Sequence, residues 1–384
     1  MFFGIVGAPN KGKSRFFSAI TGNEVGVADY PFTTIDPNKG VAFLRVECAC
    51  KKLGVKCDAR GGHCKNKMRE IPVQFLDVAG LVPGAHKGKG LGNQFLDDLR
   101  EADGFVHLID ASGKTDLEGK AAEDFPIEEE IGFLKKEMIM WILKILKRNG
   151  AKFKGKTVEE MGEALSGLGY DKKVLEEAVE KAGMDKKRID IDGGRLEALA
   201  CELYKNGKPM VVAANKADLE GVVERIEKAG LGKDVVPCSA EYEYLLTKAR
   251  KNGLVDYVPG AGEFKVRGGA DEKQKAALEK VKKFIEKNKG TGVYRVLEKL
   301  VFEKIKMIVV YPVEDENKYS DSMGNVLPDA LLMPKGAAVI DLARKVHTEL
   351  ADKFIGAIDA RTKRKISKTQ ELKDGDIIKI ISGR

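Results

Sequence analysis

The chain has 384 residues, of which 43% are hydrophobic and 33% are charged, and its formal net charge is +8. This composition indicates a soluble globular protein, and the length predicts two or three domains. No apolar run approaches the roughly 20 residues that span a bilayer, and the amino terminus is not a secretory signal, so we expect a cytoplasmic protein without a membrane segment.

The first element is a short apolar stretch followed by a glycine-rich loop. Residues 2–6 (FFGIV) predict a strand, and residues 14–22 carry apolar side chains at helical spacing. Between them, GAPNKGKS matches the spacing G-x-x-x-x-G-K-S, in which backbone N–H groups surround the phosphates of a nucleotide. In this pattern Lys13 reaches the β- and γ-phosphates, and the Ser14 hydroxyl is a ligand of Mg²⁺. The predicted nucleotide-binding residues of the loop are Gly7, Ala8, Pro9, Asn10, Lys11, Gly12, Lys13, Ser14 and Arg15.

A cysteine-rich insertion follows the second predicted strand, residues 41–46 (VAFLRV). It holds four of the six cysteines of the chain, which are Cys48, Cys50, Cys57 and Cys64. Four thiolates are a ligand set for Zn²⁺, with His63 as a substitute ligand, although the spacing departs from the common paired C-x-x-C pattern. A structural zinc site and a surface hairpin with reduced cysteines are therefore both open interpretations.

The third predicted strand ends in a motif that can hold a metal and sense a phosphate. Residues 71–80 (IPVQFLDVAG) are apolar and end in Asp77 and Gly80. The carboxylate can hold the metal through water, and the glycine N–H can report the γ-phosphate. Leu81 follows, where many nucleotide switches carry a polar residue that orients the attacking water. We therefore expect backbone and switch groups to hold the water, and a slow intrinsic turnover.

Two later motifs predict a guanine site. Residues 209–218 (PMVVAANKAD) are a buried strand whose end supplies Asp218, and its carboxylate can accept hydrogen bonds from N1–H and the 2-amino group of guanine. Adenine presents the opposite pattern and would leave that carboxylate unpaired. Residues 235–241 (VVPCSAE) bring a backbone N–H toward the guanine O6. The predicted guanine-binding residues are Asn215, Lys216, Asp218, Ser239 and Ala240.

Helical patterns separate the fourth predicted strand, residues 104–113, from the guanine motif. We therefore predict a helical insertion at 119–205 inside a GTPase domain formed by 1–118 and 206–305. Within the insertion, an apolar stripe is expected to form an intramolecular helix seam rather than a partner surface. The stripe consists of Ile131, Leu134, Met138, Ile142 and Leu146.

The remaining residues, 306–384, alternate predicted strands with one central helix. In that helix, Val339, Leu342, Ala343 and Val346 are expected to face the sheet. A basic run at 360–368 (ARTKRKISK) lies between the last strands. It is open to two interpretations, a solvated hairpin or a contact with RNA phosphates through Arg361, Lys363, Arg364 and Lys365.

Two strings place these motifs in a known family. VADYPFTTIDPNKG (27–40) and GLVPGAHKGKGLGNQFLDDLREAD (80–103) resemble the Obg-like GTPases, and the later arrangement resembles their YchF branch over nearly the whole chain. The resemblance implies an α/β fold: a P-loop GTPase domain with a mostly parallel sheet, an inserted helical domain and a C-terminal β-grasp (TGS) domain at 306–384. It also implies that Thr34 is a Mg²⁺ ligand, or Thr33 if the register differs.

The resemblance leaves the nucleotide and a second cation open. Some YchF relatives accept ATP, but the intact Asn215, Lys216 and Asp218 favour GTP here. In some GTPases with the same loop, the residue at Asn10 helps to coordinate an activating K⁺; the alternative is that Asn10 satisfies a local turn.

Motifs and resemblance together predict a Mg²⁺-dependent, GTP-binding switch that slowly hydrolyses GTP to GDP and phosphate. Lys13, Thr34 and Gly80 are the predicted catalytic residues, and Ser14, Thr34 and Asp77 hold the metal. The expected partner is a ribosome or another RNA, no membrane is involved, and a monomer suffices. The alternatives are an ATP-preferring YchF-type ATPase and a GTP-gated RNA-binding module with negligible hydrolysis.

Overall fold

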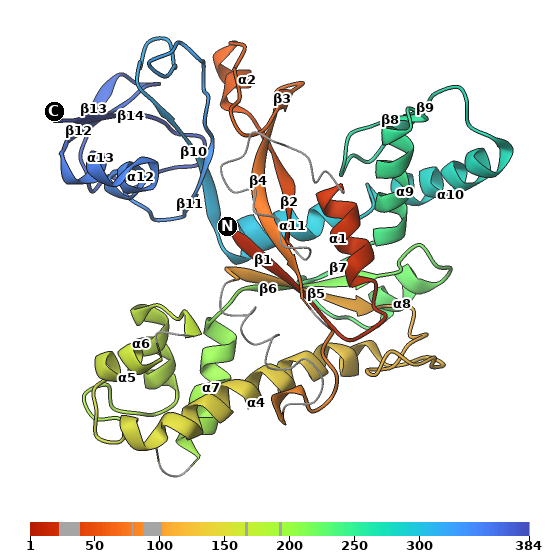
Figure 1. Ribbon diagram of the computed structural model, residues 1–384, viewed down its shortest axis with the longest axis horizontal. Coiled ribbons are helices and arrows are strands. Elements are labelled where there is room, and N and C mark those ends of the chain that lie inside the picture. Colours follow the sequence, from red (N-terminus) through yellow and green to blue (C-terminus); the bar gives the residue numbers. More distant parts are fainter. Residues whose placement is uncertain (23–38, 79, 88–101, 166–167, 192–193, 384) are drawn as a thin grey trace. The chain divides into compact units, whose positions relative to one another are not determined.

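The computed structural model describes residues 1–22, 39–78, 80–87, 102–165, 168–191 and 194–383 (Figure 1). The chain divides into two compact units, the described residues of Met1–Asn23, Ile35–Gly40 and Gln74–Leu300 and those of Glu24–Thr34, Val41–Val73 and Val301–Arg384. Segment 41–73 thus groups with the C-terminal residues, although we expected it in the GTPase domain. The expected domain boundaries stay a prediction.

A mostly parallel sheet has the strand order β2-β4-β1-β5-β6-β7, and β3 pairs with β4 (Figure 1). Neighbouring strands from β4 through β7 run parallel. All seven residues of β5 are buried, as expected for a parallel strand covered on both faces. The strands are β1 (Phe2–Val6), β2 (Lys39–Glu47), β3 (Cys64–Lys65), β4 (Met68–Asp77), β5 (Gly104–Asp110), β6 (Met210–Asn215) and β7 (Val235–Pro237).

Helices follow these strands, so the loops at the carboxyl ends of parallel strands share one edge of the sheet. A small antiparallel ribbon of β8 (Val255–Tyr257) and β9 (Phe264–Val266) lies after α9. The helices here are α1 (Lys13–Thr21), η1 (Ala85–Lys87), α8 (Val222–Lys228), α9 (Ala240–Lys251), α10 (Glu272–Asn288), α11 (Val293–Glu298) and the π-helix η3 (Lys299–Lys304).

The predicted helical insertion is present and has its own core. Its helices are α4 (Ile127–Phe153), α5 (Val158–Ala164), α6 (Lys172–Lys181) and α7 (Arg195–Asn206). The amino-terminal half of α4 packs Leu134 and Met138 with residues beside the sheet, whereas Ile142 and Leu146 belong to the helical core. Ile131 packs, partly buried, against a third cluster. The intramolecular seam is therefore confirmed, and one long helix joins the sheet to the helical region.

The C-terminal part forms a second sheet with the order β11-β10-β14-β12-β13. Its elements are β10 (Met307–Val313), β11 (Leu331–Pro334), α12 (Val339–Val346), α13 (Thr348–Asp352), β12 (Phe354–Asp359), β13 (Arg364–Ile366) and β14 (Ile377–Ser382). Val339, Leu342 and Ala343 are fully buried, as expected. The prediction for Val346 is wrong: it is 41% exposed, because α12 ends there and leaves the sheet.

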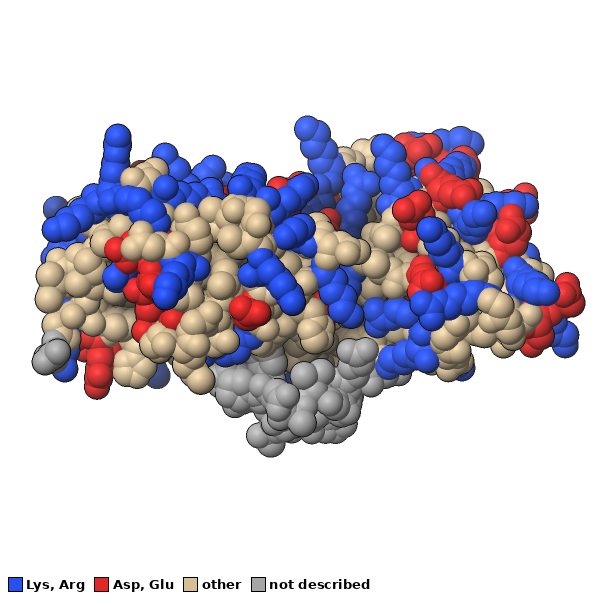
Figure 2. Space-filling model, turned by 90° about the horizontal axis from the view of Figure 1, so that it is seen from above, with Lys and Arg blue, Asp and Glu red and all other residues tan. Residues whose placement is uncertain are grey.

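The same unit contains the short helix α2 (Ala49–Leu53) and the β3–β4 hairpin, whose turn residues Asn66 and Lys67 both have positive φ. None of the described helices has the length and apolar character needed to cross a membrane. Lys and Arg side chains spread over the face shown in Figure 2, with Asp and Glu side chains between them.

Candidate nucleotide-binding site

The loop between β1 and α1 can only be built with glycines at its two ends. A Cβ on Gly7, at φ 150°, would lie 2.3 Å from the Leu108 carbonyl oxygen, and one on Gly12, at φ 93°, would lie 2.5 Å from Asn215 Nδ2. Gly12 has no side chain that could cap α1, so the N-cap residue of this nine-residue helix makes no side-chain hydrogen bond to its first N–H groups. Such a helix start favours an anion such as phosphate.

Lys13, Asp77 and Gly80 converge beside this loop, as the motif order predicts. Lys13 donates from Nζ to the Ala8 carbonyl oxygen at 2.9 Å, and a Cβ on Gly80 would lie 3.0 Å from the same Nζ. Burial lowers the pKa of Lys13, while the charge of Asp77 raises it. The lysine is therefore held within the loop, close to the predicted metal-holding carboxylate.

Leu81 is not in a position to orient a water molecule. It is 3% exposed and packs with Val78, Ala85 and Phe133, and its N–H donates to the Gly7 carbonyl oxygen at 3.1 Å. The residue after the motif glycine therefore anchors this segment to the nucleotide loop and to the core.

Lys11 connects the loop to α4. Its fully buried Nζ lies 3.0 Å from Glu130 Oε1 and donates to the carbonyl oxygen and the hydroxyl of Thr115, at 3.0 and 2.9 Å. Burial raises the pKa of Glu130 to about 7, against the opposing charge of Lys11. The Lys11 side chain is thus committed inside the protein, which leaves its backbone for the predicted nucleotide contact.

The neighbouring residues of the loop are also held by the protein. Asn10, at φ 61°, donates from Nδ2 to the Gly119 carbonyl oxygen at 2.9 Å, a contact with a segment distant in the sequence and not within a local turn. Ser14 is exposed at the start of α1. Arg15 lies over the Tyr244 ring at 4.2 Å and pairs with Glu241 at 3.0 Å.

Asn215 joins the nucleotide loop to the second guanine motif. Its Nδ2 donates to the Lys11 carbonyl oxygen at 2.9 Å, and its Oδ1 accepts from the Ala240 N–H at 3.0 Å. Ser239 caps α9 by accepting from the Tyr242 N–H. The predicted guanine residues therefore come together at the edge of the sheet that carries the loop.

The two charged residues of the guanine motif have different surroundings. Lys216, at φ 64°, donates from Nζ to Asp110 Oδ2 at 2.8 Å. Burial opposes ionisation of Asp110, but hydrogen bonds from Lys216 and two hydroxyl groups lower its pKa. Asp218 lies close enough to Tyr242 for its charge to raise the pKa of that phenol, in addition to burial.

A carboxylate from α4 holds the segment after Gly80. Glu137 accepts from the N–H of Gly84 at 2.8 Å and of His86 at 3.0 Å, and lies 2.7 Å from His86 Nδ1. Burial opposes ionisation of Glu137, whereas these hydrogen bonds lower its pKa. His86 is thus tied to the helix.

Glu130, Glu137 and His107 were not predicted from the sequence. The two glutamates are seven residues apart, so they lie on the apolar face of α4 together with Leu134; acidic residues on an apolar helix face were the available signal. His107 is buried within β5, where burial and the nearby Lys11 and Lys13 lower its pKa to about 3. Within the described chain, its Nε2 has no hydrogen-bond partner.

Thr33 and Thr34 lie outside the described residues, so their predicted contact with Mg²⁺ has no geometry here. The four cysteine sulfur atoms lie within 4.8 Å of one another. His63 is exposed and does not belong to this group, so its prediction as a substitute ligand is not supported by the arrangement. The roles of all these residues in binding stay predictions.

Three family models match successive parts of the chain. Residues 2–144 match the model described as 50S ribosome-binding GTPase, residues 213–315 match the G4 motif-containing domain of the YGR210-like Obg-like GTPases, and residues 323–382 match the TGS domain. A mostly parallel sheet, a phosphate-binding loop and these matches define a P-loop GTPase with a C-terminal TGS domain.

Individual relatives agree over most of their length. The chain is 46% identical over 388 residues to the "Uncharacterized GTP-binding protein MJ1332" of Methanocaldococcus jannaschii, covering 99% of this chain and 98% of that protein. It is 31% identical over 269 residues to the "Ribosome-binding ATPase YchF" of Pasteurella multocida, covering 67% and 70%. A solved structure of a GTP-binding protein from Pyrococcus horikoshii has a TM-score of 0.80 and 36% identity, with both chains fully covered. The chain therefore belongs to the YchF branch of the Obg-like GTPases, as its sequence predicted.

Proposed function

We propose that this protein binds GTP with Mg²⁺, hydrolyses it slowly to GDP and phosphate, and acts as a nucleotide switch for a ribosome or another RNA partner. The observation that carries the proposal is the convergence of two motifs at one sheet edge. Lys13 and Asp77 lie beside the uncapped start of α1, and Asn215 links the loop to the segment that carries the guanine motif.

The residues present fit Mg²⁺. Ser14 offers an exposed hydroxyl at the start of α1, and the Asp77 carboxylate ends the strand beside β1. We expect Ser14 and Thr34 to ligate the ion and Asp77 to hold it through water, and the bound ion would neutralise charge on the phosphates. Lys13 and the loop N–H groups would stabilise the charge that develops on the γ-phosphate oxygens, and Gly80 would report their presence.

Slow turnover follows from the place of Leu81. Since its side chain is in the core, no side chain at that position orients the attacking water. The rate then depends on backbone groups, on residues 27–40 and on the partner. Phosphate release from GTP, measured with Mg²⁺ in KCl and in NaCl, tests this chemistry. A faster rate in KCl would support a K⁺ role for Asn10, and equal rates would remove it. No GDP production in either salt would favour a binding module without intrinsic hydrolysis.

ATP is the second candidate substrate, because the Pasteurella multocida relative is described as an ATPase. GTP is preferred here because Asp218 follows an intact Asn215-Lys216 pair and would be left unpaired by adenine. Competition between labelled GTP and unlabelled ATP decides between them. Displacement of GTP at equal ATP concentration would overturn the preference.

The ribosome proposal is supported by the family model described as a 50S ribosome-binding GTPase and by the name of that relative. Within the basic run, Arg361 is tied to the Gly375 carbonyl oxygen at 2.6 Å and Lys363 lies over the Tyr319 ring at 4.8 Å. Arg364 and Lys365 are exposed on β13 and are the better phosphate contacts.

Co-sedimentation with ribosomes tests the switch. We expect GDP and a non-hydrolysable GTP analogue to give different bound fractions, because the nucleotide orders the segments that follow the loop. Reversing the charge of Arg364 and Lys365 should weaken binding and reduce its salt dependence. Equal binding in both nucleotide states would contradict the switch.

A further inference from the structure

The four clustered cysteines lie in a part of the chain that the nucleotide site does not use. Cys48 and Cys50 are each 1% exposed, and Cys57 and Cys64 are half-buried. Their sulfur atoms are 3.9 Å apart in the pair Cys48–Cys57 and 3.8 Å apart in the pair Cys50–Cys64, and all four lie within 4.8 Å of one another. This burial argues against reduced cysteines spread over a surface hairpin.

The spacing fits one tetrahedral ion. Zinc binds a thiolate sulfur at about 2.3 Å, so four sulfur atoms around one zinc ion lie about 3.8 Å apart. The pairs Cys48–Cys57 and Cys50–Cys64 already have this separation. A small inward movement of the remaining pairs, from at most 4.8 Å, completes the tetrahedron.

Three backbone features hold the thiols in place. Cys48 occupies the N-cap of α2, which puts Cys50 in its first turn, and Gly54 ends the helix at φ 69°. The Cys48 N–H donates to the Lys67 carbonyl oxygen at 2.8 Å, in the turn of the hairpin whose first strand contains Cys64. We call residues 48–67 the cysteine knuckle.

A buried cation lies next to the knuckle. Arg69 is 1% exposed, and its hydrogen bonds within the described chain go to the carbonyl oxygens of Leu327 and Pro328. Its Nε has no partner there. A buried guanidinium without a carboxylate is costly, and an anionic centre nearby removes the cost.

We propose that Cys48, Cys50, Cys57 and Cys64 bind one structural Zn²⁺ ion as four thiolates. Binding releases the four thiol protons and forms a centre with a net charge of −2, and no electron is transferred. Arg69 offsets part of that charge. All four positions are taken by protein, so the centre has no open position for a substrate, which is typical of structural zinc.

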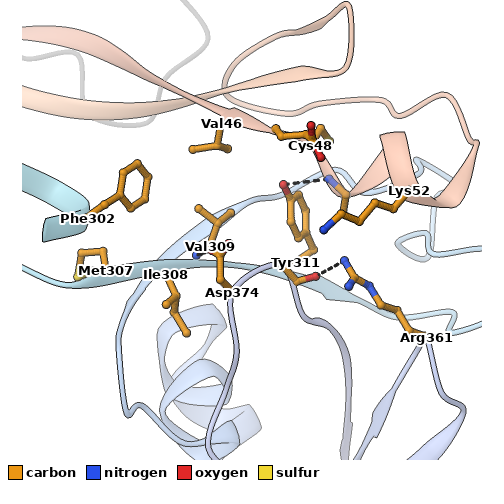
Figure 3. A pocket seen from close by; sticks show the side chains of 13 residues that line it. Val46, Cys48, Lys52, Phe302, Met307, Ile308, Val309, Tyr311, Arg361 and Asp374 are labelled. Carbon is orange, nitrogen blue, oxygen red and sulfur yellow. Dashed lines mark hydrogen bonds between the residues drawn. The ribbon is translucent and has the colours of Figure 1, made fainter. Parts of the chain in front are cut away.

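The ion would stabilise contacts that the knuckle makes within its own unit. The Asp58 and Arg60 N–H groups donate to the carbonyl oxygens of Val326 and Pro328, at 2.8 and 2.7 Å. The Tyr311 hydroxyl accepts from the Ala49 N–H at 3.3 Å, beside a pocket of about 550 Å³ (Figure 3). Loss of the ion should therefore release both the knuckle and its pairing with segment 326–328.

Metal analysis of the full-length protein, purified without chelator, tests the proposal. We expect one zinc per chain by elemental analysis, and a native mass that exceeds the apo mass by one zinc less two protons. The double variant Cys57→Ser, Cys64→Ser should lose the zinc. Cys201→Ser, which changes a thiol in α7 outside the knuckle, is the matched control and should retain it.

The native mass of the unmodified protein keeps the test decisive if the double variant fails to fold. Replacement of zinc by Co²⁺ gives a second readout, since a tetrahedral tetrathiolate cobalt centre has intense visible absorption. Absence of metal in folded protein, stoichiometric iron in place of zinc, or a thiol titration that finds the four cysteines in disulfides would each overturn the proposal.

Discussion

The nucleotide loop and the cysteine knuckle satisfy their polar groups in opposite ways. Around the loop, the side chains have partners within the protein: Lys13 donates to Ala8, Asn10 to Gly119 and Lys216 to Asp110. In the knuckle, the four sulfur atoms lie within 4.8 Å of one another, and the Nε of the buried Arg69 has no hydrogen-bond partner among the described residues.

We expect such a difference between a site that exchanges its ligand and a site that keeps it. A buried polar group without a hydrogen-bond partner costs about 1–3 kcal/mol. The polar groups of a loop that releases its nucleotide therefore need partners within the protein while no nucleotide is bound. The ligands of a permanently bound ion need no other partners, because the free energy of ion binding is part of the free energy of folding.

Removal of zinc is the largest expected effect. Apparent binding free energies of structural zinc are on the order of 10 kcal/mol, so a strong chelator should abolish amide hydrogen-exchange protection in the cysteine knuckle and at 326–328. Protection of β1 and α1 should be unchanged, and so should GTP affinity. If the nucleotide loop lost protection in parallel, the two sites would not be independent.

Lys13→Ala should come next. It removes a cation that we expect to contact two phosphates, and charge-assisted bonds of about 1.5–3 kcal/mol each imply GTP binding weakened by about 300-fold. Zinc content should stay at one per chain. Lys147→Ala, at an exposed lysine of α4, is the matched control and should bind GTP normally. Calorimetric titration measures the GTP affinity of both variants. An unchanged GTP affinity of Lys13→Ala would show that this loop does not bind the phosphates.

Asp218→Asn tests the guanine end of the site. An amide loses one acceptor for guanine, so GTP affinity should fall by about 100-fold. The new NH₂ group can instead donate to the 2-oxo group of xanthine, so xanthosine triphosphate should bind better than it does to the unmodified protein. Equal GTP affinity of the two proteins would show that Asp218 does not contact the base.

Glu130 should make the free energy of unfolding of the first unit depend on pH. The pKa of Glu130 in the folded protein, about 7, is above its ordinary value of 4.5. Its contribution to the free energy of unfolding is therefore full below pH 4.5 and is lost as the pH rises through 7. Relative to Glu130→Gln, the unmodified protein should lose about 2 kcal/mol between pH 5.5 and 7.5. Parallel denaturant titrations measure the difference, and a pH-independent difference would contradict the assignment.

Glu137→Gln should have the smallest effect. It preserves side-chain volume but weakens the charge-assisted bonds to Gly84 and His86, which is worth about 1.5 kcal/mol. Hydrogen exchange of residues 81–87 should accelerate by roughly tenfold by that figure. Glu129→Gln, at an exposed position of the same helix, is the control. Equal exchange in both variants would mean that α4 does not hold this segment.

Local patterns were sufficient to predict much of this molecule. The strand, loop and helix at 2–22, the strand ending at Asp77 and the seam of α4 each depend on residues close in sequence. The same holds for the cysteine cluster as a candidate site. Each could therefore be predicted from the periodicity of apolar residues and from the spacing of motif residues.

Long-range contacts were not predictable. Nothing in the sequence indicates that Lys11 meets Glu130, that Glu137 accepts from Gly84, or that Arg60 pairs with the segment before β11, because each contact joins residues separated by 50 or more positions in the chain. Val346 fitted the helical period, but the period does not say at which residue a helix leaves its sheet.

Calorimetric titration of the zinc-loaded protein with GTP and, separately, with ATP in the presence of Mg²⁺ tests the central claim most directly. We predict one GTP site per chain and an affinity for ATP at least tenfold lower, because adenine leaves Asp218 unpaired. Equal affinities, or no heat of binding with GTP, would contradict the account of this site.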